Sequence, residues 1–274
     1  MSVSIIGCGW LGQALAASLQ ADKISVLASY QSQATLEKLK NLNIAAIQLS
    51  LPLSDLSVKN FAALFQQKIL VIAIPPQLKK GKLDYPLKIQ QLVQQAELGQ
   101  TQHIILLNST AIYNGLAGEV NESSALDLNA EKVSTLLAAE HEATKFSKQV
   151  HILRLSGLVG PNRHPGKFLQ SNRVFTNASA QVNLVHQTDV VNIIQQLITS
   201  SVDNITKIYN VVSATKSDKK SYYQVAAKAM NLPIPNFEEE KVDNKGKQIS
   251  GKKLRDELNY QYHYDDLLQW ATTV

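Results

Sequence analysis

The chain opens with a short apolar strand that runs directly into a glycine-rich loop, SIIGCGWLG, at residues 4–12. Its glycines have the spacing Gly-x-Gly-x-x-Gly, and good helix formers follow over residues 13–20. In this setting the first glycine permits a tight turn, the second lets the backbone approach a pyrophosphate, and the third lets the helix pack on the sheet. The loop therefore predicts a dinucleotide site, and the residues expected at the cofactor are Gly7, Gly9, Trp10, Leu11 and Gly12.

Apolar runs and amphipathic segments alternate through the first 155 residues. This alternation is typical of a parallel sheet covered by helices on both faces. We therefore predict an α/β fold with a doubly wound parallel sheet, the Rossmann fold. The expected strands are residues 3–6, 24–27, 44–49, 69–74, 104–107 and 151–155, and the expected helices are residues 13–20, 33–42, 84–98 and 130–148.

The pattern changes after Leu155, where SGLVGPNRHPGKF is rich in glycine and proline. We predict a dinucleotide-binding domain over residues 1–155 and a smaller, mixed substrate-binding region over residues 156–274. Two later stretches, residues 182–185 and 207–212, look like strands and are expected to return to the main sheet.

The end of the second strand decides which dinucleotide the loop would hold. NAD-specific sites usually place a carboxylate there, on the ribose 2′-hydroxyl. This chain has no acid between Asp22 and Glu37, so nothing repels a 2′-phosphate. Ser29, Tyr30 and Gln31 can donate hydrogen bonds to that phosphate, which makes NADP the first choice and NAD the alternative.

The glycine loop, LLNSTAIYN, ILRLSGLVGP and VNLVHQTDVV occur in an order that resembles the extended and atypical short-chain dehydrogenase/reductases. This family includes nucleotide-sugar epimerases and dehydratases, and GCGWLG with GLVGPNRHPGKF looks most like a subgroup of NAD(P)-dependent epimerases. The resemblance implies that Ser109 contacts a small-molecule substrate. It also implies a homodimer formed through a two-helix face.

The family's acid/base pair, Tyr-x-x-x-Lys, is missing. None of the nine tyrosines is followed by lysine four residues later. In the segment that resembles the active-site helix, the two positions fall near Lys132 and Leu136. Besides Ser109, the catalytic candidates are therefore Tyr113, near the expected pocket, and His164 as an acid or base.

The loop PNRHPGKF follows the carboxyl end of an expected strand, the edge where doubly wound folds bind ligands. Its side chains Arg163, His164 and Lys167 suit a phosphate, carboxylate or sugar-nucleotide substrate. A triad of His186 and Asp189 with Ser109 is not expected, because no nucleophile elbow is present. Helix capping by Thr188 and Asp189 is the better account.

Composition excludes several other classes. The net charge is +5, but the basic residues do not gather on one helix with aromatics, so no nucleic-acid partner is expected. The longest apolar run, Ile69 to Pro76, is too short to span a bilayer. With Cys8 as the only cysteine, no intrachain disulfide and no cysteine-based zinc site can form, and we assign no metal site.

Two functions follow from these features. The first is a cytoplasmic, NADP-dependent oxidoreductase or epimerase/dehydratase-like enzyme that acts on a small polar, anionic or sugar-nucleotide-like substrate. The alternative is a catalytically impaired dinucleotide-binding sensor or scaffold, because the acid/base pair is absent.

Overall fold

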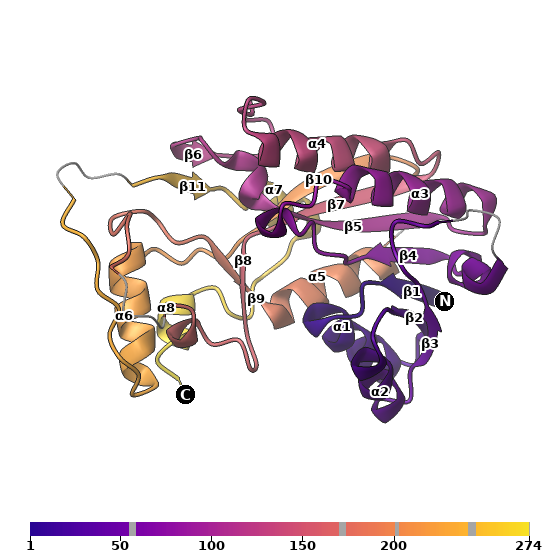
Figure 1. The fold of residues 1–274 in the computed structure, drawn as a ribbon, viewed down its shortest axis with the longest axis horizontal. Coiled ribbons are helices and arrows are strands. Elements are labelled where there is room, and N and C mark those ends of the chain that lie inside the picture. The colour runs from indigo at the N-terminus through magenta and orange to yellow at the C-terminus, as the bar shows by residue number, and fades with distance from the viewer. Residues whose placement is uncertain (55–58, 170–173, 201–202, 241–244, 274) are drawn as a thin grey trace. The chain divides into compact units, whose positions relative to one another are not determined.

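A computed structural model describes residues 1–54, 59–169, 174–200, 203–240 and 245–273. Its centre is a seven-stranded parallel sheet in the order β10-β7-β5-β4-β1-β2-β3 (Figure 1). The order reverses at β1, as in doubly wound folds. The strands are β1 (Ser2–Ile6), β2 (Ser25–Tyr30), β3 (Ala45–Gln48), β4 (Ile69–Ile72), β5 (His103–Ser109), β7 (Gln149–Leu155) and β10 (Thr206–Val211).

Helices cover both faces of this sheet. In Figure 1, α3 and α4 lie on one face, and α1, α2 and α5 lie on the other. The helices are α1 (Trp10–Ala21), α2 (Gln33–Asn41), α3 (Tyr85–Leu98), α4 (Glu131–Thr144) and α5 (Gln187–Thr199). The predicted α/β doubly wound fold is confirmed. Within the described part of the chain, no helix is both long and apolar enough to cross a membrane.

The chain divides into two compact units, each made of several segments. Unit 1 consists of Met1–Ile112, Leu128–Arg154 and Val191–Ile208, and unit 2 consists of Tyr113–Asp127, Leu155–Val190 and Tyr209–Val274. The chain passes from unit 1 to unit 2 between Arg154 and Leu155, at the predicted boundary near residue 155. The other points where the chain passes between the units were not predicted, because no change in composition marks them.

Unit 2 holds two small parallel sheets, one of β6 (Gly118–Val120) with β11 (Lys247–Ile249) and one of β8 (Gly157–Val159) with β9 (Leu184–His186). Of the two stretches expected to rejoin the main sheet, residues 207–212 do so as β10. The expectation for residues 182–185 is wrong. The Gly157 N–H donates to the Asn183 carbonyl, and Leu184 packs into the apolar core of unit 2.

That core consists of short strands and helices held by aromatic and aliphatic side chains. Helix α6 (Lys219–Ala229) contributes Tyr222, and α8 (Leu267–Trp270) contributes Leu267. The helix between them in this unit is α7 (Lys252–Leu258). The cluster consists of Val159, Val182, Leu184, Tyr222, Ala226, Leu267 and Ala271.

A buried ion pair ties α4 to the sheet in unit 1. The Arg154 guanidinium donates to both carboxylate oxygens of Glu140, at 2.9 and 2.7 Å, and both side chains are less than 5% exposed. The Asn108 amide donates a third hydrogen bond to Glu140, at 2.8 Å. A charge buried in this way is stable only while its partners remain.

A pair of histidines is buried between β5 and β7. The His103 Nε2 lies 2.7 Å from the His151 Nδ1, and both residues are at most 3% exposed. Burial, aided by the neighbouring His151, lowers the pKa of His103 to about 3. In unit 2, burial likewise lowers the pKa of His186 to about 4. Both side chains are therefore neutral in the folded protein at neutral pH.

These two histidines predict that the protein loses stability in mild acid. The unfolded histidines bind protons near pH 6.5, whereas the folded ones resist protonation until about pH 3 to 4. Their contribution is therefore complete above pH 6.5 and is lost as the pH falls below it. Below pH 6.5 each histidine adds a slope that rises toward about 1.4 kcal/mol per pH unit, which urea unfolding between pH 7 and 5 can measure.

The test variant is His103→Gln, and its matched control is His141→Gln. Since His141 is exposed on α4, its replacement should leave the slope unchanged. His103→Gln should reduce the slope of the unfolding free energy against pH, because it removes one of the protons that are taken up on unfolding. A slope that is the same in all three proteins would contradict the assignment.

Candidate nucleotide-binding site

At two positions of the glycine loop between β1 and α1, a side chain would clash with nearby backbone atoms. Gly7 has φ +96°, and a Cβ there would lie 2.6 Å from the carbonyl carbon of Ala73. A Cβ on Gly12 would lie 2.7 Å from the Gly7 carbonyl oxygen. The loop is therefore packed against the backbone that follows β4, and the first turn of α1 is packed against the loop.

Gly9 has a different environment. A Cβ at this position would meet nothing within 4 Å, so the space beside it is open. Gly9 is also the N-cap of α1, where no side chain caps the helix and the first turn carries no acid. Backbone N–H groups and the positive end of the helix dipole are the features that hold a pyrophosphate in such loops, so the residues present fit a dinucleotide.

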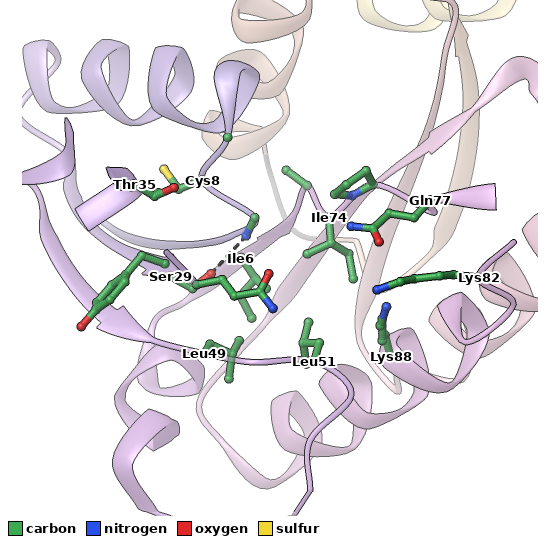
Figure 2. Close-up of a pocket in the computed structure, with 16 residues that line it drawn as sticks. Ile6, Cys8, Ser29, Thr35, Leu49, Leu51, Ile74, Gln77, Lys82 and Lys88 are labelled. Carbon is green, nitrogen blue, oxygen red and sulfur yellow. Dashed lines mark hydrogen bonds between the residues drawn. The ribbon is translucent and has the colours of Figure 1, made fainter. Parts of the chain in front are cut away.

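A pocket of about 240 Å³ lies at the carboxyl ends of β1, β2 and β4, entirely within unit 1 (Figure 2). The Ser29 hydroxyl accepts a hydrogen bond from the Gly7 N–H at 3.1 Å, which joins the second strand to the loop. The lining residues are Ile6, Gly7, Cys8, Gly9, Ser29, Tyr30, Gln31, Thr35, Leu49, Leu51, Ala73, Ile74, Pro75, Gln77, Lys82 and Lys88.

Five of the predicted cofactor residues line this pocket: Gly7, Gly9, Ser29, Tyr30 and Gln31. Trp10, Leu11 and Gly12 do not line it. They form the first turn of α1, where Leu11 and Gly12 are buried on the side that faces the sheet. Leu11 and Gly12 can thus contribute only backbone groups to a nucleotide site, whereas Trp10 is half-buried.

The charge of the lining is one-sided. It contains Lys82 and Lys88 but neither aspartate nor glutamate. We did not identify these lysines from the sequence, although Lys88 carries a readable signal. It lies among Tyr85, Ile89 and Leu92 on the apolar face of α3, where a lysine is unexpected.

Cys8 also lines the pocket, but it is not suited to chemistry. It is 2% exposed, and burial raises the pKa of its thiol to about 12. Because only the thiolate is a good nucleophile, Cys8 is inert at neutral pH.

The residues at the expected acid/base positions do not supply that chemistry. Lys132 is exposed in the first turn of α4, and Leu136 is buried against the sheet. The Ser109 hydroxyl accepts a hydrogen bond from the Ala111 N–H at 3.1 Å, which is a local turn contact. Its hydrogen is still available to a substrate.

Tyr113 does not fit the catalytic role predicted for it. The side chain is fully buried, and its hydroxyl donates to the Asn210 Oδ1 at 2.8 Å. A phenol held in this way anchors two segments of unit 2 and cannot reach a substrate.

His164 is also a structural residue, contrary to our prediction of an acid or base. Its Nδ1 accepts from the Gly166 N–H at 3.2 Å, so the proton is on Nε2, which donates to the Ala271 carbonyl at 3.1 Å. Burial lowers its pKa. With both ring nitrogens occupied, His164 fastens the loop to the end of α8. Arg163 and Lys167 lie exposed on the same loop.

No protein-family model matches the chain. Protein YeeZ from Escherichia coli K12 is 32% identical to it over 270 residues, which covers 97% of each chain. The chain belongs to the YeeZ family. The same protein from Escherichia coli O157:H7 matches equally well.

Solved structures show how this YeeZ-family fold relates to others. UDP-glucuronic acid 4-epimerase from Bacillus cereus, in complex with NAD, superimposes with a TM-score of 0.80 at 15% identity, over 99% of this chain and 94% of the epimerase. MoeE5, in complex with UDP-glucose and NAD, gives 0.78 at 16% identity, over 100% and 97%. A functionally unknown conserved protein from Silicibacter pomeroyi gives 0.74 at 17% identity, over 98% and 96%. The fold is that of the NAD-dependent epimerases and dehydratases, as the motifs implied.

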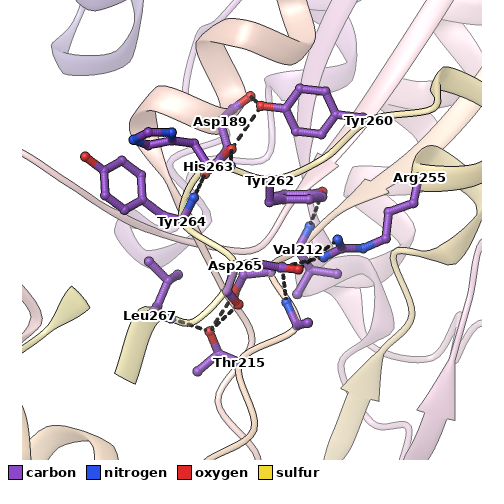
Figure 3. A network of polar contacts seen from close by, with 12 residues as sticks. Asp189, Val212, Thr215, Arg255, Tyr260, Tyr262, His263, Tyr264, Asp265 and Leu267 are labelled. Atoms are coloured by element: carbon purple, nitrogen blue, oxygen red, sulfur yellow. Dashed lines mark hydrogen bonds and ion pairs between the residues drawn. The ribbon is translucent and has the colours of Figure 1, made fainter. Parts of the chain in front are cut away.

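In this YeeZ-family chain, Asp189 has a role that neither a triad nor helix capping explains. It is fully buried and accepts hydrogen bonds from the Tyr260 hydroxyl at 2.9 Å and from the N–H groups of His263 and Tyr264 (Figure 3). The cap on α5 comes instead from His186, whose Nδ1 accepts from the Thr188 N–H. Asp189 thus fastens residues 260–264 within unit 2.

Proposed function

We propose that the protein binds NADP(H) and acts as an oxidoreductase or epimerase/dehydratase-like enzyme on a small polar, anionic or sugar-nucleotide-like substrate. The observation that carries this proposal is the pocket at Gly9, which is open beside the helix N-terminus and free of acidic lining residues. Structures with the same fold are described in complex with NAD and UDP-sugars, which supports the assignment of ligand class.

The residues divide the work as follows. Gly9 and the first turn of α1 would face the pyrophosphate, while Tyr30 and Gln31 would face the adenosine ribose. When bound, the nicotinamide supplies hydride transfer. Ser109 is the last residue of β5, at the same edge of the sheet, and its hydroxyl hydrogen would orient a substrate carbonyl or hydroxyl.

The test is to titrate the purified protein with NADPH and NADH while following tryptophan emission, and then to screen for hydride exchange. Incubation of NADP⁺ with a panel of sugar nucleotides and hydroxy acids deuterated at the carbinol carbon should move label from one substrate class onto the nicotinamide as that carbon is oxidised to a carbonyl, and Ser109→Ala should weaken that transfer. Binding of neither nucleotide would contradict the proposal, as would the absence of label transfer to every member of a broad panel.

A specific observation also favours a second function, a dinucleotide-dependent sensor or scaffold. The positions expected for the catalytic tyrosine and lysine hold Lys132 and Leu136. The other two acid/base candidates, Tyr113 and His164, are both engaged in structural hydrogen bonds. A sensor should bind NADPH and NADP⁺ but transfer no label, and the two forms should differ in their effect on assembly. Identical sedimentation with either nucleotide and without any would contradict this function.

We further propose a homodimer through α3 and α4. An apolar groove runs between these helices, and beside it Leu98 is 81% exposed. A second copy related by a two-fold axis would bury this apolar groove against itself. Sedimentation equilibrium should give a dimer, and a monomer at micromolar concentration would contradict it.

A further inference from the structure

We propose that Lys88, assisted by Lys82, recognises the 2′-phosphate of NADP. This inference rests on the proposed function and deepens it by assigning cofactor specificity to residues outside the glycine loop and outside the second strand.

Lys88 is the stronger of the two observations. It lies on α3 with its side chain 9% exposed, which is unusual for a lysine. Its ammonium donates to the Asp84 Oδ1 at 2.8 Å, four residues earlier. Within the described chain its other two N–H bonds have no acceptor. A desolvated ammonium needs acceptors for its hydrogens, and the open space in front of it is the nucleotide pocket.

Lys82 adds a second positive charge from the loop that precedes α3. Its side chain is exposed, and it has no ion-pair or hydrogen-bond partner among the described residues. Figure 2 shows the nitrogen atoms of Lys82 and Lys88 both pointing into the pocket. Two convergent ammonium groups without a carboxylate in the lining form a site for an anion with several oxygen acceptors.

The position of the pair selects the 2′-phosphate rather than the pyrophosphate. The pyrophosphate belongs at Gly9 and the first turn of α1, whereas the adenosine ribose belongs at the end of β2. Tyr30 and Gln31, at that strand end, line the same pocket as the two lysines. In Figure 2 the two lysines lie across the pocket from Cys8, the residue between Gly7 and Gly9.

Asp84 explains how a lysine can serve in this role. Its carboxylate is 33% exposed and lies one helical turn before Lys88. It fixes the direction of the ammonium while leaving two donors for the ligand. It is a positioning residue, and it is not part of the pocket lining.

The experiment compares two fragments that differ by one phosphate, 2′,5′-ADP and 5′-AMP, together with NADPH and NADH, by isothermal titration. Lys88→Gln should weaken 2′,5′-ADP and NADPH about tenfold, and Lys82→Gln somewhat less, because each removes a charged donor. Binding of 5′-AMP and NADH should stay within about twofold. Lys80→Gln is the matched control, since Lys80 is exposed in the same loop and does not line the pocket.

Three results would overturn the inference. The first is equal weakening of phosphorylated and unphosphorylated ligands, which would place the lysines at the pyrophosphate or in the fold. The second is wild-type protein that binds NADH as tightly as NADPH. The third is Lys88→Arg, which keeps the charge, behaving like Lys88→Gln. Because Lys82 is exposed, its variant should fold even if the Lys88 variants do not. By contrast, wild-type protein that binds no dinucleotide would refute the proposed function itself.

Discussion

Replacing Glu140 by alanine is expected to lower the free energy of unfolding by about 3 to 5 kcal/mol. The change leaves the Arg154 guanidinium, 4% exposed, without its bidentate partner inside the protein. It also removes the acceptor of the Asn108 amide. Urea unfolding followed by circular dichroism measures the loss, which could amount to much of a typical domain's stability.

The matched control is Glu142→Ala on the same helix. Glu142 pairs with Lys145, which is 50% exposed, so its removal should cost less than about 1 kcal/mol. The double variant Glu140→Leu with Arg154→Met should be more stable than Glu140→Ala, because it leaves no charge buried. If the two single alanine variants unfold at the same urea concentration, the ion pair does not have the importance we assign to it.

The second large effect is expected at the glycine loop. Gly7→Ala should cost about 3 kcal/mol of stability, because a side chain at φ +96° is strained and its Cβ would meet the Ala73 backbone at 2.6 Å. Gly9→Ala should leave stability nearly unchanged, since its Cβ enters open space. It should nevertheless weaken NADPH binding at least about tenfold, because the methyl group occupies the place of a phosphate.

Thermal unfolding and nucleotide titration of both variants separate these two effects. A Gly9→Ala protein that binds NADPH as well as the wild type would mean that the pyrophosphate does not lie beside Gly9. A Gly7→Ala protein of unchanged stability would show that the turn can relax away from β4.

The sequence was sufficient to predict the sheet because its evidence is local. The apolar runs became β1 to β5 and β7, and the glycine spacing marked the turn where Gly7 takes its positive φ. The family resemblance gave the fold class for the same reason, since its motifs follow the strand ends. Hydrophobic periodicity could not show that β9 belongs to a small sheet and not to the main one, because a short buried strand has the same apolar pattern in either sheet.

The failed predictions for side chains have a common physical cause. Tyr113 and His164 were singled out by residue type and by nearness to an expected pocket. Their partners, Asn210 and Ala271, lie about a hundred residues away in the chain. Lys88 was overlooked for the opposite reason, since its helix was predicted but the orientation of its ammonium depends on Asp84 and on the pocket in front of it.

The interleaving of the two units sets the order in which the protein can be completed on the ribosome. The edge strand β10 is not made until residue 211, long after β7 ends at residue 155. During that interval, the growing chain has β7 as an unprotected sheet edge, the type of surface that promotes aggregation. A fragment cut at residue 155 would keep this edge permanently, and expression of the first domain alone should therefore give insoluble material.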